Sequence, residues 1–137
     1  RMGDPECQTI LPLLKSELHE ILLACCNKTL NKTSIKWNNE KSICIVLCSR
    51  GYPDKYDKNI EITNINGLNL KKNDYLFHAG TSKKEKKVFA VGGRVLNFVS
   101  ISKEFSAARE NVLFNLKKLN WVKGFYRKDI GHKVIKK

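Results

Sequence analysis

Apolar residues recur at helical spacing in two long segments of this 137-residue chain. Between Thr9 and Cys26 they return every three or four positions, which predicts one amphipathic helix with Pro12 in its first turn. The same spacing between Ser102 and Leu119 predicts a second helix, with Ser102 as its N-cap. The apolar positions are Ile10, Leu14, Leu18, Ile21, Leu22 and Cys25 in the first helix, and Phe105, Ala108, Val112, Leu116 and Leu119 in the second. We expect the first helix to clamp the preceding octapeptide against the core.

Between these helices, short apolar and β-branched runs predict strands. Ser42–Cys48 is apolar almost throughout, which is typical of a strand buried on both faces. Further strands are predicted at residues 60–62, 75–78, 88–91 and 94–100, with turns at 51–54, 66–67 and 92–93. The lysine-rich run 83–87 reads as a solvated hairpin loop, and 27–41 as a connector in which Trp37 is a lid over the core. The pattern predicts an α+β fold, in which a small, mostly antiparallel sheet is crossed by a packed helix.

The composition narrows the class of protein. Hydrophobic residues make up 42% of the chain, enough for a core, and no apolar run approaches the roughly 18 residues needed to span a bilayer. The N-terminal residues do not resemble a signal peptide. The five cysteines (Cys7, Cys25, Cys26, Cys44 and Cys48) lack the paired spacing of a zinc site. We expect reduced thiols in a cytoplasmic protein, most of them small core residues.

The net charge of +13 raises the possibility of nucleic-acid binding. However, the lysines are scattered or gathered in loop-like runs such as 83–87, and aromatic residues do not alternate with them along one face. A free-standing basic module that binds nucleic acid is therefore the alternative function, and it requires an affinity that falls steeply with salt.

Two polar clusters are candidate sites. In the first eight residues, Gly3 and Pro5 restrict the backbone around Arg1, Asp4 and Glu6, an arrangement that suits a charged substrate. A solvated turn with a helix cap is the simpler interpretation.

Near the other end of the chain, Arg127 and Lys128 stand beside Asp129 and Gly131 and form a plausible phosphate grip. The simpler interpretation here is a solvated tail. Arg94 follows Gly92-Gly93 and is either a functional cation or, with equal weight, an exposed residue of a hairpin turn. The lone His78 is more typical of a structural histidine.

Five motifs, in order, resemble the phosphoribosylamine–glycine ligase family of ATP-grasp enzymes. They are Arg-x-Gly-Asp-Pro-Glu-x-Gln at 1–8, Ser-Arg-Gly-Tyr-Pro at 49–53, His-Ala-Gly-Thr at 78–81, Gly-Gly-Arg-Val-Leu at 92–96 and Tyr-Arg-Lys-Asp-Ile-Gly at 126–131. Together they extend over essentially the whole chain.

The resemblance implies that residues 1–36 are the end of an ATP-grasp domain (a loop plus a helix) and that 37–137 form a small C-terminal α+β domain. It implies ATP-driven joining of glycine to 5-phosphoribosylamine, a step of purine biosynthesis. Arg1, Asp4 and Glu6 match catalytic residues, and Arg127, Lys128 and Arg94 would bind the substrate's phosphate.

The same resemblance places the Mg²⁺ (or Mn²⁺) ligands, and most of the ATP site, upstream of Arg1. We therefore expect no metal ligands within this chain. We also expect the C-terminal portion of a larger ligase, inactive without the upstream portion of the polypeptide, with no nucleic-acid or membrane partner.

Overall fold

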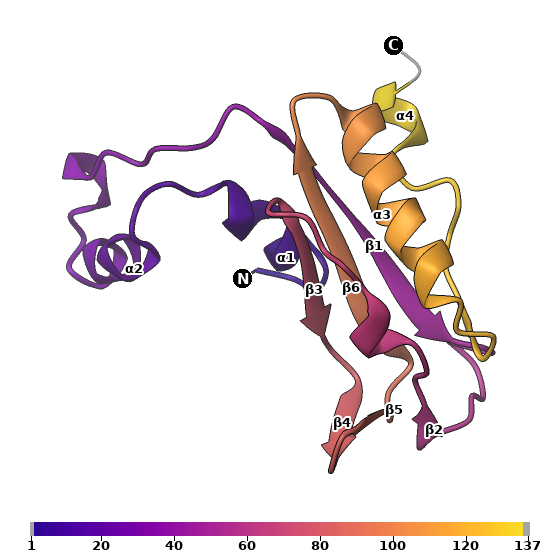
Figure 1. Cartoon of the computed structure of the whole chain (residues 1–137). Helices are drawn as coiled ribbons and strands as arrows, with labels where there is room; N and C mark the ends of the chain where they lie inside the picture. Colours follow the sequence, from indigo (N-terminus) through magenta and orange to yellow (C-terminus); the bar gives the residue numbers. More distant parts are fainter. Residues whose placement is uncertain (1, 136–137) are drawn as a thin grey trace.

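The computed structural model describes residues 2–135, which form one long antiparallel sheet, a smaller sheet and several helices (Figure 1). The helices are α1 (Glu6–Ile10), α2 (Leu18–Cys26), α3 (Phe105–Leu119) and α4 (His132–Ile135), with single 3₁₀ turns η1 (Leu11–Leu13), η2 (Leu30–Lys32) and η3 (Ile65–Gly67). The strands are β1 (Lys41–Ser49), β2 (Ile60–Glu61), β3 (Asp74–His78), β4 (Thr81–Lys84), β5 (Lys87–Ala90), β6 (Arg94–Ser102) and β7 (Gly124–Phe125). The α+β prediction is confirmed.

The larger sheet has the strand order β3-β6-β1-β7, and every neighbouring pair is antiparallel. Its centre is the β1–β6 pair, in which Ile45 lies opposite Phe98 and Leu47 opposite Leu96. Successive side chains of a strand point to opposite faces, so these four residues share one face of the sheet. A register shift after Leu47 brings Cys48 opposite Arg94.

Helix α3 covers that face and completes the core (Figure 1). Ala108, Val112, Leu116 and Leu119 are almost completely buried at the predicted helical spacing. The predicted N-cap is wrong, because Ser102 is the last residue of β6 and the helix begins after Glu104. The opposite face of β1 and β6 is contacted by the short helix α1, so β1 is covered on both sides, as its apolar sequence predicts.

The smaller sheet has the order β2-β5-β4. Residues 83–87 are therefore not a loop throughout: Lys83 and Lys84 belong to β4, and only a tight turn separates them from β5. Strands β5 and β6 are consecutive in the chain but belong to different sheets. The Gly92-Gly93 pair thus links two sheets, where the sequence had predicted a hairpin.

The N-terminal region departs most from prediction. The single helix predicted over 9–26 is divided into α1, η1 and α2, with extended backbone at Leu14 and Glu17 between them. Helix α2 and turn η2 lie on an arm that projects away from the sheets (Figure 1). Trp37 is 47% exposed near the base of this arm, so the prediction that it covers the core is wrong.

All five cysteines are free thiols, as predicted, but only Cys44 is buried. Cys25 and Cys26 are exposed on α2, so the expectation that most cysteines are core residues is wrong. No helix among residues 2–135 is long and apolar enough to cross a membrane.

Candidate functional site

The N-terminal turn lies on the face of the sheet opposite α3, and Asp4 is tied to that face. The Nδ2 of Asn97 donates a hydrogen bond of 3.0 Å to Asp4 Oδ1, and Arg94 Nε lies 3.3 Å from Asp4 Oδ2. Asn97 is 0% exposed, whereas both side chains of the ion pair are partly exposed. Two residues that the sequence predicted separately, Asp4 and Arg94, are thus brought into direct contact by strand β6.

The other two residues predicted in this segment are not part of that contact. Glu6 is the first residue of α1 and is exposed. Arg1 lies outside the described residues.

In the C-terminal cluster, Arg127 binds Asp129 through two hydrogen bonds. Arg127 Nε donates to Asp129 Oδ1 at 3.1 Å and Nη2 to Oδ2 at 2.6 Å, and the arginine side chain is 69% exposed. The hydrogen bond from Arg127 holds the pKa of the Asp129 carboxyl below its usual value, while Asp129 raises the pKa of Arg127. The pair is therefore fully charged at neutral pH, and the guanidinium is fixed in orientation.

Arg109 of α3 anchors the same segment. Its Nε donates to the carbonyl of Ile130 at 2.9 Å, and its Nη2 donates to the carbonyl of Lys128. The backbone of Lys128 is therefore attached to the helix, while its side chain is exposed. Arg109 is a residue that the sequence analysis missed.

A hollow of about 320 Å³ lies beside both clusters. Pro5 of the N-terminal turn and Arg127 of the C-terminal cluster both line it. The rest of its lining is mostly apolar and consists of Cys44, Ile45, Val46, Cys48, Tyr52, Pro53, Phe125, Tyr126 and Ile130. Segments more than 120 positions apart in the chain thus meet around one cavity, and Arg127 is the charged residue in its lining.

The two cysteines in this hollow both have raised pKa values. Burial raises the pKa of Cys44 to about 12, although a hydrogen bond with Thr9 opposes the change. Burial also raises the pKa of Cys48, and the nearby Arg94 cation opposes it. Both changes disfavour the thiolate form that cysteine-based covalent catalysis requires.

The remaining candidates have structural or no evident catalytic roles. Nδ1 of His78 lies 2.9 Å from Thr81 Oγ1 at the start of the β4 hairpin, which agrees with the structural interpretation. Among residues 2–135, no group of three or more His, Cys, Asp or Glu side chains could hold a metal ion. Asp4 is already bound to Arg94 and Asn97, so the donors present among the described residues do not fit a Mg²⁺ site.

Asn97 is the second residue missed by the sequence analysis. It is a polar side chain in the middle of the apolar strand segment Val95–Val99. A buried amide in such a run needs a hydrogen-bond partner, and that requirement was a usable signal.

The chain is similar to known proteins along almost its whole length. Residues 42–133 match the family described as "Phosphoribosylglycinamide synthetase, C domain". The phosphoribosylamine–glycine ligase of Agrobacterium fabrum is 40% identical over 135 residues, which are 98% of this chain and 31% of that protein. The trifunctional purine biosynthetic protein adenosine-3 of Gallus gallus is 42% identical over 138 residues, 98% of this chain and 14% of that protein.

A solved structure agrees as well. The crystal structure of phosphoribosylamine–glycine ligase from Thermotoga maritima superposes with a TM-score of 0.71 at 28% identity. The match includes 96% of this chain and 32% of that one, so the chain spans about a third of the length of the single-function ligases that it matches. The resemblance seen in the sequence motifs is confirmed: this chain belongs to the phosphoribosylglycinamide synthetase C-domain family.

Proposed function

We propose that this chain is the C-terminal part of an ATP-dependent ligase that joins glycine to 5-phosphoribosylamine, giving glycinamide ribonucleotide, ADP and phosphate. The observation that carries the proposal is identity of about 40% with phosphoribosylamine–glycine ligases over almost the whole chain. The same relatives disfavour the alternative of a free-standing nucleic-acid-binding module.

In this proposal, the face that carries Asp4 binds the phosphoribosyl end of the substrate. A guanidinium has five N–H donors, and the contacts with Asp4 and Asp129 use one donor of Arg94 and two of Arg127. Each arginine therefore keeps donors for a phosphate oxygen while its carboxylate partner holds it in place. Lys128 would add a mobile positive charge at the rim.

We further propose that residues 1–36 complete an ATP-grasp domain and that 37–137 are the separate C-terminal domain. Large apolar side chains on the projecting arm support this division. Leu22, Leu23 and Leu30 are 55%, 59% and 41% exposed in the described chain. A concentration of exposed apolar side chains is typical of a surface that another part of a protein covers.

The partner that the arm requires is, in this proposal, the upstream portion of the ligase polypeptide. That portion would hold ATP, Mg²⁺ (or Mn²⁺), glycine and the remaining catalytic groups, and Arg1, Asp4 and Glu6 would extend its active site. The isolated 137-residue chain would then be inactive, and the location of the enzyme would be cytoplasmic.

The test is ADP release by the whole ligase polypeptide that contains this chain. The reaction mixture holds Mg-ATP, glycine, and phosphoribosylamine made in situ from ribose 5-phosphate and ammonia. The proposal requires ADP release that depends on both glycine and the ribosyl substrate. ADP release that does not change when glycine is omitted would contradict it.

A further inference from the structure

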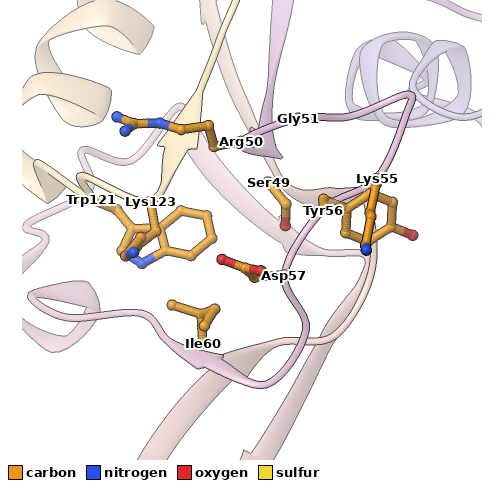
Figure 2. A pocket seen from close by; sticks show the side chains of 9 residues that line it. All are labelled: Ser49, Arg50, Gly51, Lys55, Tyr56, Asp57, Ile60, Trp121 and Lys123. Carbon is orange, nitrogen blue, oxygen red and sulfur yellow. The ribbon is translucent and has the colours of Figure 1, made fainter.

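A second hollow, of about 380 Å³, lies at the end of β1, outside the site described above (Figure 2). Its lining consists of Ser49, Arg50, Gly51, Lys55, Tyr56, Asp57, Ile60, Trp121 and Lys123. The loop 50–57 separates the two hollows, since its Tyr52 and Pro53 line the first hollow, while the second is lined by Arg50, Gly51, Lys55, Tyr56 and Asp57. A ligand in the second hollow would therefore contact neither Arg94 nor Arg127.

The second hollow is positively charged. Three of its four charged residues are cations, Arg50, Lys55 and Lys123, and the fourth is Asp57. Within the described part of the chain, none of the four forms an ion pair. An anion that enters would therefore meet cations whose charges are not already neutralised by neighbouring carboxylates.

The geometry of the cationic side is fixed by backbone contacts. The Arg50 N–H donates to the Lys123 carbonyl at 2.9 Å, and Arg50 Nη2 donates to the Val122 carbonyl at 2.8 Å. Gly51 has a φ of +97°, and a Cβ at this position would lie 2.3 Å from the Lys55 carbonyl oxygen. The loop therefore folds back tightly on itself and brings Lys55 to the same hollow as Lys123.

The remaining walls offer other kinds of contact. Trp121 is 7% exposed, and its indole Nε1 donates to the Glu61 carbonyl at 2.9 Å, so the ring is held in place. Figure 2 shows the Asp57 carboxylate between the Trp121–Lys123 side and the Tyr56–Lys55 side of the hollow. A carboxylate in this position can accept hydrogen bonds from hydroxyl groups.

We propose that this hollow is a binding site for a small sugar phosphate. Lys55 and Lys123, with Arg50 at the rim, would hold the phosphate group, and Asp57 would accept hydrogen bonds from sugar hydroxyls. The Tyr56 ring would pack against the apolar C–H surface of the sugar, and the buried Trp121 would form part of the wall of the hollow. A phosphate without hydroxyls leaves Asp57 as a repulsive charge, and a neutral sugar leaves the cations unused, so one molecule that carries both groups fits best.

The experiment is a titration of the full 137-residue chain with ribose 5-phosphate, followed by two-dimensional ¹H–¹⁵N NMR. The chain has two tryptophans, Trp121 in the hollow and Trp37 at the base of the arm, so the indole signal of Trp37 is an internal control. We expect the Trp121 signal to shift and saturate while the Trp37 signal stays constant. Ribose alone should give no shift, and inorganic phosphate should bind more weakly.

Variants separate this site from general charge effects. Lys123→Ala and Lys55→Ala should each raise the Kd for ribose 5-phosphate about five- to tenfold, whereas Lys72→Ala, an exposed lysine elsewhere, should leave it unchanged. Asp57→Ala should weaken the binding of ribose 5-phosphate, because a hydrogen-bond acceptor for the sugar is lost. The same variant should strengthen the binding of inorganic phosphate, because the repulsive charge is removed. Absence of a Trp121 shift, equal shifts of both tryptophans, or equal effects of Lys72→Ala and Lys123→Ala would overturn the proposal. The outcome is independent of the ligase proposal, because the titration measures no activity.

Discussion

Replacing Asp4 by alanine tests whether the N-terminal turn is held on the sheet by Asn97 and Arg94. The substitution leaves the completely buried Asn97 amide without its acceptor, at a cost of about 1–3 kcal/mol. Loss of the partly exposed Arg94 ion pair adds only about 0.2–1 kcal/mol, because water screens it. We expect the free energy of unfolding to fall by about 2 kcal/mol, measured by urea denaturation followed by circular dichroism.

A double-mutant cycle isolates the contact. In an Asn97→Ala background, Asp4→Ala should cost at least about 1 kcal/mol less than in the wild-type chain, because no buried donor remains to be orphaned. Asp54→Ala is the matched control, since it removes the same charge from an exposed turn. An equal cost in both backgrounds, or an Asp4→Ala effect no larger than that of Asp54→Ala, would refute the reasoning.

Further predictions concern thiols and close packing. Cys25 is exposed and should react quickly with a thiol reagent at pH 8. Cys44 is buried and should react only on unfolding, and the half-buried Cys48, whose pKa is raised, should react more slowly than Cys25; mass spectrometry of the labelled chain checks this order. Burial raises the pKa of Cys44 from 9.0 to about 12, so the contribution of the neutral thiol to the free energy of unfolding is complete below pH 9. It should then fall by about 1.4 kcal/mol per pH unit up to the folded pKa. Urea midpoints of the wild type and Cys44→Ala should therefore converge above pH 9, and a constant difference would contradict this. Gly80→Ala should lower the free energy of unfolding by about 1–3 kcal/mol, because its Cβ would lie 2.6 Å from backbone atoms. Gly67→Ala should change it by under about 0.5 kcal/mol, because the space around Gly67 is open. Equal unfolding free energies for the two variants would count against this packing.

The sheet and α3 could be predicted from the sequence because their signals are local. The β-branched run at 42–48 and the regular spacing from Phe105 to Leu119 each correspond to one element. Local signals failed where the structure depends on which strands pair with each other. Nothing within Gly92-Gly93 shows that the strands on either side join different sheets, because that depends on partners elsewhere in the chain.

The N-terminal region shows a different limit. Apolar spacing continues from Ile10 to Cys25, yet the backbone is extended at Leu14 and Glu17, so periodicity survives a break in the helix. Helices shorter than about 12 residues depend on packing, and in the described chain α2 packs on the short turn η2. The bounds of such a short helix are therefore poorly defined by its own sequence.

For the candidate site, the residue types could be predicted but their partners could not. Asp4 and Arg94 stand out as charged residues beside glycine or proline, and Arg127 stands out as one of two adjacent cations. Their pairings could not be predicted, because contact between Asp4 and Arg94 requires β6 to lie beneath the N-terminal turn. Asn97 could have been singled out as a polar residue in an apolar strand, but its partner Asp4 is 93 positions away and could not be predicted.

In the proposed function, Arg94 and Arg127 bind the phosphate of the ribosyl substrate. The most direct test is the KM of the whole ligase polypeptide for phosphoribosylamine and for ATP, measured in Arg94→Ala and Arg127→Ala variants beside the Lys72→Ala control. Loss of one charge-assisted hydrogen bond should raise the KM for phosphoribosylamine at least about tenfold and leave that for ATP within about twofold. Equal increases for both substrates, or no change for either, would contradict the claim.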